Sequence, residues 1–124
     1  MPQAGNRVRL ARKFTFEAGH RLPHAPPDHK CRGIHGHSFT VEIVCEGEID
    51  PQSGWLIDFA DIKHAFAPLL ARLDHRMLND IEGLENPTVE NLARWIWIRL
   101  KPQLHVLAQV NVYETHAARC EYRG

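Results

Sequence analysis

The chain has 124 residues, and its 15 basic and 15 acidic side chains give a formal net charge of zero. This length is that of one ordinary domain, so we expect a single domain over residues 1–124. The balanced charge argues against a protein that binds nucleic acids or anionic membranes, because such proteins usually carry an excess of positive charge.

No apolar stretch of the sequence is long enough to span a bilayer, and Met1–Lys13 lacks the apolar segment of a secretion signal. We therefore expect a cytoplasmic protein that binds a specific small molecule rather than a membrane or a nucleic acid. Its three cysteines, Cys31, Cys45 and Cys120, are irregularly spaced and odd in number, which predicts free thiols. A short chain also leaves apolar surface that a homo-oligomer would cover.

Two segments in the first half alternate apolar and polar residues, as half-buried strands do. Arg12–Glu17 places Phe14 and Phe16 on one face, and Phe39–Glu46 follows the same rule. The intervening residues 21–34 hold three prolines and a glycine, which predicts a long loop of functional interest.

The spacing of apolar residues then changes from strand-like to helical. After a turn at Asp50–Gly54, one apolar stripe runs over Ile62–Leu73, with Asp58 as the candidate N-cap. A second helix begins after Thr88, its candidate N-cap, and ends at Pro102.

The C-terminal part returns to strand-like alternation. Val110 and Val112 oppose Asn111 and Tyr113, and Ala118–Tyr122 is placed to pair back as a hairpin. The order strand, strand, helix, helix, strand, strand predicts an α+β fold. We expect a four-stranded antiparallel sheet with two helices packed on one face.

Nine histidines are many for so short a chain, and five of them fall between His20 and His37. His35 and His37 are two residues apart at the entry to the second strand, so both imidazoles point to one face. His20 ends the first strand and would lie across from them in an antiparallel pair. Three histidines suit zinc and leave a fourth position open for substrate or water. A closed structural site with Cys31 as fourth ligand, or plain surface histidines, fits the same spacing.

Four further residues are candidates for proton chemistry. Cys31 lies between two basic residues, and nearby cations or a metal lower a thiol's pKa, so it is a candidate base or nucleophile. In the pair Asp74 and His75, a carboxylate could orient a histidine, but only if the backbone is irregular; a helix-end salt bridge is the alternative. Glu114 is either a solvated charge or a carboxylate that accepts two N–H bonds from a ring amidine.

Five segments of the sequence together resemble the 6-pyruvoyl-tetrahydropterin synthase family. They are Phe16–Leu22 (FEAGHRL), Cys31–Ser38 (CRGIHGHS), Leu73–His75 (LDH), Asn86–Asn91 (NPTVEN) and Tyr113–Thr115 (YET), in the family's order. The short gap between Cys31 and His35, and the ending CEYRG, are similar to the 6-carboxy-tetrahydropterin synthase branch. That branch serves the biosynthesis of queuosine and related 7-deazapurines.

The resemblance implies a fold, an assembly and roles for the residues. The fold is the tunnelling fold, in which small subunits close into a barrel, and trimers stack as a hexamer with active sites between subunits. The implied roles are zinc ligands for His20, His35 and His37, proton acceptor for Cys31, proton relay for Asp74 and His75, pterin anchor and relay member for Glu114, and pterin-pocket lining for Thr88, Glu90 and Thr115.

The expected activity is that of a zinc-dependent lyase acting on 7,8-dihydroneopterin triphosphate. The loop between the first two strands concentrates positive charge and is the candidate site for the triphosphate: Arg21, His24, His29, Lys30 and Arg32. Two alternatives stay open at this point. One is formation of 6-pyruvoyl-tetrahydropterin at the same site, and the other is a non-catalytic, zinc-stabilised binding module.

Overall fold

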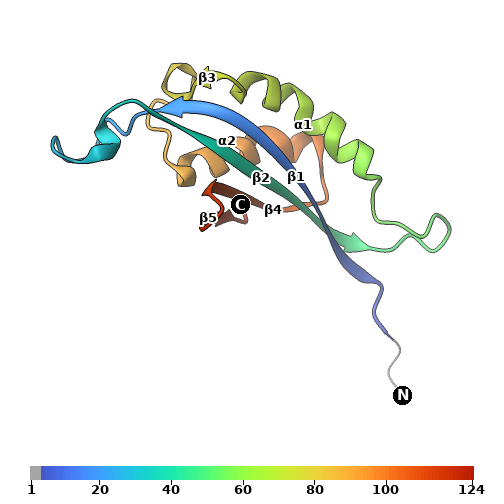
Figure 1. The fold of residues 1–124 in the computed structure, drawn as a ribbon. Coiled ribbons are helices and arrows are strands. Elements are labelled where there is room, and N and C mark those ends of the chain that lie inside the picture. Colours follow the sequence, from blue (N-terminus) through green and yellow to red (C-terminus); the bar gives the residue numbers. More distant parts are fainter. Residues whose placement is uncertain (1–3) are drawn as a thin grey trace.

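The computed structural model describes residues 4–124 as a twisted sheet with two helices (Figure 1). The strands are β1 (Arg7–His20), β2 (His35–Glu48), β3 (Arg76–Met77), β4 (Leu107–Thr115) and β5 (Ala118–Tyr122). The helices are α1 (Phe59–Leu73) and α2 (Val89–Leu100), and short 3₁₀ turns cover Lys30–Arg32, Leu78–Asp80 and Lys101–Gln103. The α+β class and the two helices agree with the prediction.

The sheet has five strands in the order β3-β1-β2-β4-β5, so the predicted four-stranded, wholly antiparallel sheet is wrong. The four longer strands pair antiparallel, but β3 pairs parallel with β1, placing Arg76 opposite Ala18 and Met77 opposite Gly19. A strand of two residues is too short to show alternation in the sequence. Its pairing arises only because α1 returns the chain to the edge of β1.

One hydrophobic core fills the space between the sheet and the helices. Alternate strand residues such as Phe16, Phe39 and Val112 pack with apolar residues of both helices, so the two helices cover the same face of the sheet, as predicted. Both predicted N-caps are confirmed. The Asp58 carboxylate accepts the backbone N–H of Ala60 at 2.8 Å, and the Thr88 hydroxyl accepts that of Asn91 at 3.1 Å.

The opposite face of the sheet carries a chain of polar side chains. Gln109 and Asn111, each only 4% exposed, bond to one another at 2.7 Å. Asn111 donates to Glu42 at 2.8 Å, and Gln109 accepts from Arg9 at 2.9 Å. The donors and acceptors of these side chains are therefore paired with one another on the face of the sheet that the helices do not cover.

The loop of residues 21–34 projects from one end of the β1–β2 pair, and residues 49–58 leave the other end (Figure 1). The loop is ordered by its own backbone: Leu22 donates to the Cys31 carbonyl at 2.8 Å, and His29 donates to that of Pro26 at 2.8 Å. Over residues 4–124, neither helix has the length and apolar content needed to cross a membrane.

Candidate functional site

Three imidazoles converge at the end of the core face where β1 meets β2. The register places His20 opposite His35 and Ala18 opposite His37, so all three rings project from the same face. The ring centroids of the three histidines lie 4.5–5.1 Å apart. Glu114, near the end of β4, completes the group, and one ligand atom from each of the four residues lies within 4.8 Å of all the others.

Two of the rings are held by backbone carbonyl oxygens. His20 Nδ1 lies 2.9 Å from the carbonyl oxygen of Pro87, and His35 Nδ1 lies 2.8 Å from that of Gly33. A carbonyl oxygen can only accept, so each Nδ1 must carry the hydrogen, and in the neutral ring Nε2 keeps its lone pair. Burial also lowers the pKa of His20, which favours that neutral form. Metal-binding histidines are typically held in this way, with the ring nitrogen that does not bind the metal donating to a carbonyl or carboxylate oxygen.

The three Nε2 atoms are buried and have no hydrogen-bond partner within residues 4–124. Glu114 Oε1 nevertheless lies 3.3 Å from His20 Nε2 and 3.2 Å from His37 Nε2. A carboxylate facing nitrogen lone pairs is repelled unless a cation lies between them. The residues therefore fit a metal ion, and the donor set of imidazoles and one carboxylate is one that zinc accepts.

Cys31 stands apart from this group. It lies half-buried in the 3₁₀ turn of the loop, where its backbone N–H donates to His29 Nδ1 at 3.0 Å. Its sulfur is not among the gathered ligand atoms of the described residues, whose fourth member is Glu114. The geometry thus gives no support to a closed site formed by three histidines and this cysteine.

Asp74 and His75 follow α1 in an irregular backbone that lets the adjacent side chains meet. His75 has a left-handed φ of 58°, and its Nδ1 lies 3.0 Å from Asp74 Oδ1. The backbone of Glu17 holds both residues: its N–H donates to Asp74 Oδ1 at 2.9 Å, and its carbonyl accepts the N–H of His75. The Glu17 N–H holds the pKa of the Asp74 carboxyl below its ordinary value.

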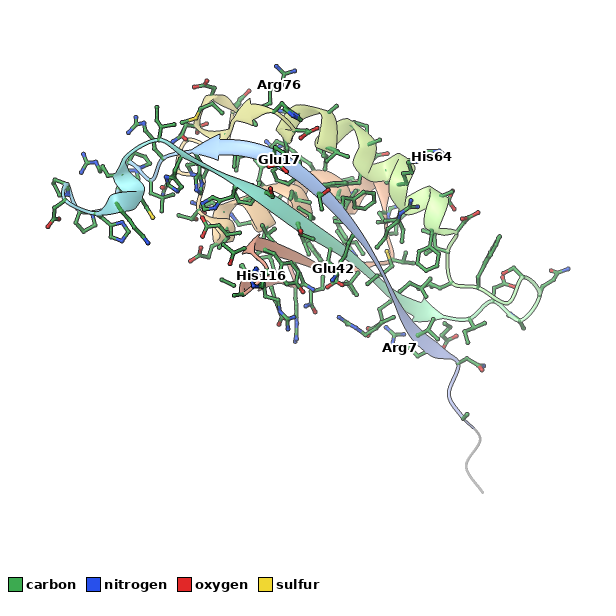
Figure 2. All side chains as sticks on the ribbon, viewed as in Figure 1. Arg7, Glu17, Glu42, His64, Arg76 and His116 are labelled. Atoms are coloured by element: carbon green, nitrogen blue, oxygen red, sulfur yellow. The ribbon has the colours of Figure 1, made fainter. Side chains whose placement is uncertain are left out.

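The His75 imidazole is 78% exposed and lines an open groove of about 530 Å³. Glu17 and Ser38 also line this groove, and the Ser38 hydroxyl donates to the Glu17 carboxylate at 2.7–2.8 Å. Both residues alternate with Ala18 and His37, so their side chains point to the polar face of the sheet. Figure 2 shows Glu17 on β1 and Arg76 where the chain leaves α1. The same groove is lined by His37, and the backbone bond of His75 to Glu17 places this exposed imidazole at the edge of β1, outside the group of gathered ligand atoms.

The remaining predicted pocket residues lie around the ends of α2 and β4. Thr88 caps α2 directly after Pro87, whose carbonyl holds His20. Glu90 is exposed in the first turn of α2, and the Thr115 hydroxyl accepts the backbone N–H of Ala117 at 3.3 Å in the turn after β4. Of these, only the Thr88 segment is connected to the histidine group by a hydrogen bond.

Two functional contributions are not predictable from side-chain type. The carbonyls of Pro87 and Gly33 hold the ligand rings, yet every residue has a carbonyl, and nothing in its side chain marks this use. Only the contact to Gly33 has a weak signal in the sequence, because Gly33 lies two residues before His35 and its carbonyl is therefore near that ring.

The chain has clear similarity to known proteins. Residues 9–124 match the family model described as 6-pyruvoyl tetrahydropterin synthase. A 6-carboxy-5,6,7,8-tetrahydropterin synthase of Synechocystis sp. is 38% identical, covering 91% of each chain. A dihydroneopterin monophosphate aldolase of Pyrococcus furiosus is 37% identical, covering 79% of each. The structure of Caenorhabditis elegans 6-pyruvoyl tetrahydropterin synthase superposes with a TM-score of 0.87 at 31% identity, covering 95% of this chain and 96% of that one.

Proposed function

The chain belongs to the 6-pyruvoyl tetrahydropterin synthase family of enzymes, and from this premise we propose that it is a zinc-dependent 6-carboxytetrahydropterin synthase. The reaction converts 7,8-dihydroneopterin triphosphate and water to 6-carboxy-5,6,7,8-tetrahydropterin, acetaldehyde and triphosphate. Its product would enter queuosine or 7-deazapurine biosynthesis. The similarity to the Synechocystis enzyme over nine-tenths of the chain supports this branch.

The observation that carries the proposal is the gathering of three buried Nε2 atoms that have no hydrogen-bond partner within residues 4–124. His20, His35 and His37 supply them, and two of these rings are fixed in the ligand tautomer by backbone carbonyls. Buried polar atoms are normally paired, so three buried Nε2 atoms without a partner within residues 4–124 call for a bound group. They are the proposed zinc ligands.

When bound there, zinc supplies Lewis acidity that lowers the pKa of a substrate hydroxyl. Cys31 is the proposed proton acceptor on one side of the substrate side chain. It lies in the loop that joins two ligands, since β1 ends at His20 and β2 begins at His35, and its carbonyl accepts the backbone N–H of Leu22 near the base of that loop. A loop tethered at both ends beside the metal keeps the thiol near the reacting carbons.

Asp74 and His75 are the proposed proton relay on the opposite side. Asp74 Oδ1 is adjacent to Nδ1 of His75, which leaves Nε2 to exchange protons with the substrate. The exposure of this imidazole, which is not part of the gathered ligand group, suits a site completed by a second subunit. We therefore infer a homohexamer, a dimer of trimers, with active sites between subunits.

Glu114 is the proposed anchor for the pterin ring. A carboxylate accepts two parallel N–H bonds from the amidine edge of such a ring, which fixes its orientation. Thr88, Glu90 and Thr115 would line the same pocket, and Thr88 is the best placed because the residue before it touches His20.

The loop of residues 21–34 is the proposed site for the triphosphate. Within residues 4–124, no carboxylate lies within ion-pair distance of Arg21, Lys30 or Arg32. An ordered loop with unpaired cations beside the metal ligands would attract the negatively charged end of the substrate.

The second candidate function is formation of 6-pyruvoyl-tetrahydropterin, which stops before carbon–carbon cleavage. It is supported by the likeness to the Caenorhabditis elegans enzyme of that name, at 31% identity. Both reactions would use the same metal and the same base. The residues of the site therefore do not distinguish the two reactions, and only the products do.

The test is to incubate the purified zinc-loaded protein with 7,8-dihydroneopterin triphosphate and to identify products by mass spectrometry with aldehyde trapping. We expect 6-carboxy-tetrahydropterin, acetaldehyde and triphosphate. Cys31→Ala should lose about 10²–10⁴ in rate, the usual cost of removing a positioned acid or base, while its zinc content stays at the wild-type level.

Two results would contradict the proposal. If 6-pyruvoyl-tetrahydropterin accumulated with no trapped aldehyde, the chain would carry the second candidate activity. If Cys31→Ala lost its zinc as well as its turnover, the cysteine would be a ligand and the assignment of the base would be wrong. Cys45→Ala is the matched control, because Cys45 lies in the core and has no assigned part in the chemistry.

A further inference from the structure

The structure assigns Glu114 a second role, as the fourth protein ligand of the metal in the substrate-free protein. This inference depends on the proposed function only in that both place a metal among the three histidines. Glu114 enters the group from β4, a strand that supplies none of the imidazoles.

The distances carry the argument. In a tetrahedral zinc site with bonds of about 2.0 Å, neighbouring ligand atoms lie about 3.3 Å apart. Glu114 Oε1 lies 3.3 Å from His20 Nε2 and 3.2 Å from His37 Nε2, the separation of neighbouring tetrahedral ligands, and its ligand atom lies within 4.8 Å of that of His35. Neither of these two contacts is a hydrogen bond, and both Nε2 atoms have no hydrogen-bond partner within residues 4–124.

The hydrogen bonds lead to the same assignment. His20 Nδ1 donates to the Pro87 carbonyl at 2.9 Å, so in the neutral ring the Nε2 atom offers a lone pair rather than a proton to the carboxylate. Glu114 therefore gains nothing from this position unless a cation lies between them. Its side chain is 33% exposed and has room to turn outward, whereas the His20 ring is fully buried.

A consequence for turnover follows. With four protein ligands a tetrahedral zinc would have no open position, so a substrate hydroxyl would bind either as a fifth ligand or in place of the Glu114 carboxylate. The same carboxylate is the proposed pterin anchor and cannot hold both partners with one oxygen pair. Arrival of the pterin ring would thus draw Glu114 outward and open the metal to the substrate side chain.

The test uses Co²⁺ as a spectroscopic substitute for zinc, together with a chelator competition for zinc itself. In metal-depleted full-length protein, Glu114→Gln should weaken zinc binding about 10- to 100-fold, a cost typical of losing a group that supports a metal site. The visible absorption of the Co²⁺ form should shift as well, because water would replace the carboxylate oxygen. Glu48→Gln, an exposed carboxylate at the far end of β2, is the matched control and should change neither quantity.

The two readouts separate a ligand from a supporting group. If Glu114→Gln weakened zinc binding but left the Co²⁺ spectrum unchanged, Glu114 would act only from outside the coordination shell, and the inference would fail. Unchanged affinity would refute it too. A shifted spectrum in a protein that converts no pterin would uphold this inference and reject the proposed function.

Discussion

The three cysteines lie in three different environments, and this determines which thiol is available for chemistry. Cys45 lies fully buried on the core face of β2, and burial raises the pKa of its thiol to about 11. Cys120 lies on β5, where burial, with Glu90 and Glu121 nearby, also raises the pKa of its thiol. Cys31 is the only one of the three in a loop.

We predict that iodoacetamide at pH 8 modifies Cys31 first in the folded protein. The thiolate is the reactive form, and at that pH a thiol with a pKa of about 11 is almost wholly protonated, so Cys45 should react slowest. Its burial adds a second barrier, since the reagent cannot reach it without local unfolding. Mass spectrometry of the alkylated peptides over time measures the three rates.

Unfolded protein is the control, because all three thiols should then react at similar rates. Cys31→Ala should remove the fast phase and leave the two slow ones. Equal rates for Cys31 and Cys45 in the folded protein would contradict the assignment of Cys31 as the accessible thiol.

At the scale of elements, the junction between α1 and β3 places the proposed relay. α1 ends at Leu73, Asp74 donates its N–H to the Leu70 carbonyl, and His75 then takes a left-handed φ of 58°. Side chains with a Cβ adopt this region at a cost of roughly 1–2 kcal/mol, and β-branched residues fit it worst. The two hydrogen bonds to the backbone of Glu17 hold the junction against that cost.

We predict that His75→Gly and His75→Val both lose turnover but differ in stability. Both remove the imidazole, whereas only Val must force a β-branched side chain into left-handed backbone. His75→Val should therefore be less stable than His75→Gly by about 1–2 kcal/mol. Denaturant unfolding of the two variants measures this difference.

His64 is the matched control for this pair, because it is an exposed histidine in the middle of α1 (Figure 2). In right-handed helical backbone the order should reverse, with Gly less stable than Val. If the Gly and Val variants of His75 ranked as those of His64 do, the left-handed junction would not be a source of strain.

At the scale of the whole molecule, the proposed relay is separate from the group of proposed ligands. The metal group lies on the core face of β1, β2 and β4, whereas the exposed His75 lies at the β1 edge and lines an open groove. Its imidazole faces solvent rather than the gathered ligand atoms. A second copy of the chain would complete the site if the groove of one copy met the ligand end of the other.

We predict that two inactive variants restore activity when their subunits are mixed. His35→Ala removes a ligand and His75→Ala removes the relay, so neither homo-oligomer should turn over. After subunit exchange in equal amounts, about a quarter of intersubunit sites would receive an intact ligand set from one copy and an intact relay from another. Activity of the mixture and sedimentation of each sample, expected to be hexameric, are the measurements.

Mixing His35→Ala with His20→Ala is the control, because both variants damage the same ligand set and no site can be repaired. Rescue in that mixture would show contamination or refolding rather than complementation. A fully active wild-type monomer would exclude an intersubunit site.

The sequence by itself determined most of the local structure. Periods of two and of 3.6 residues depend only on nearby side chains, so the long strands, both helices and the caps Asp58 and Thr88 were predictable. The His20, His35 and His37 group was also predictable as a cluster, because strand alternation and antiparallel pairing decide which side chains share a face.

Only the tertiary structure decided the features that depend on distant segments meeting. β3 exists because α1 delivers Arg76 and Met77 to the free edge of β1, and two residues hold no periodic signal. Glu114 joins the histidines because β4 lies beside β2, which no spacing along the chain reports. The Pro87 carbonyl fixes His20 from 67 residues away. Side-chain type tells what a residue can bind, but the packing of separate elements decides what it meets.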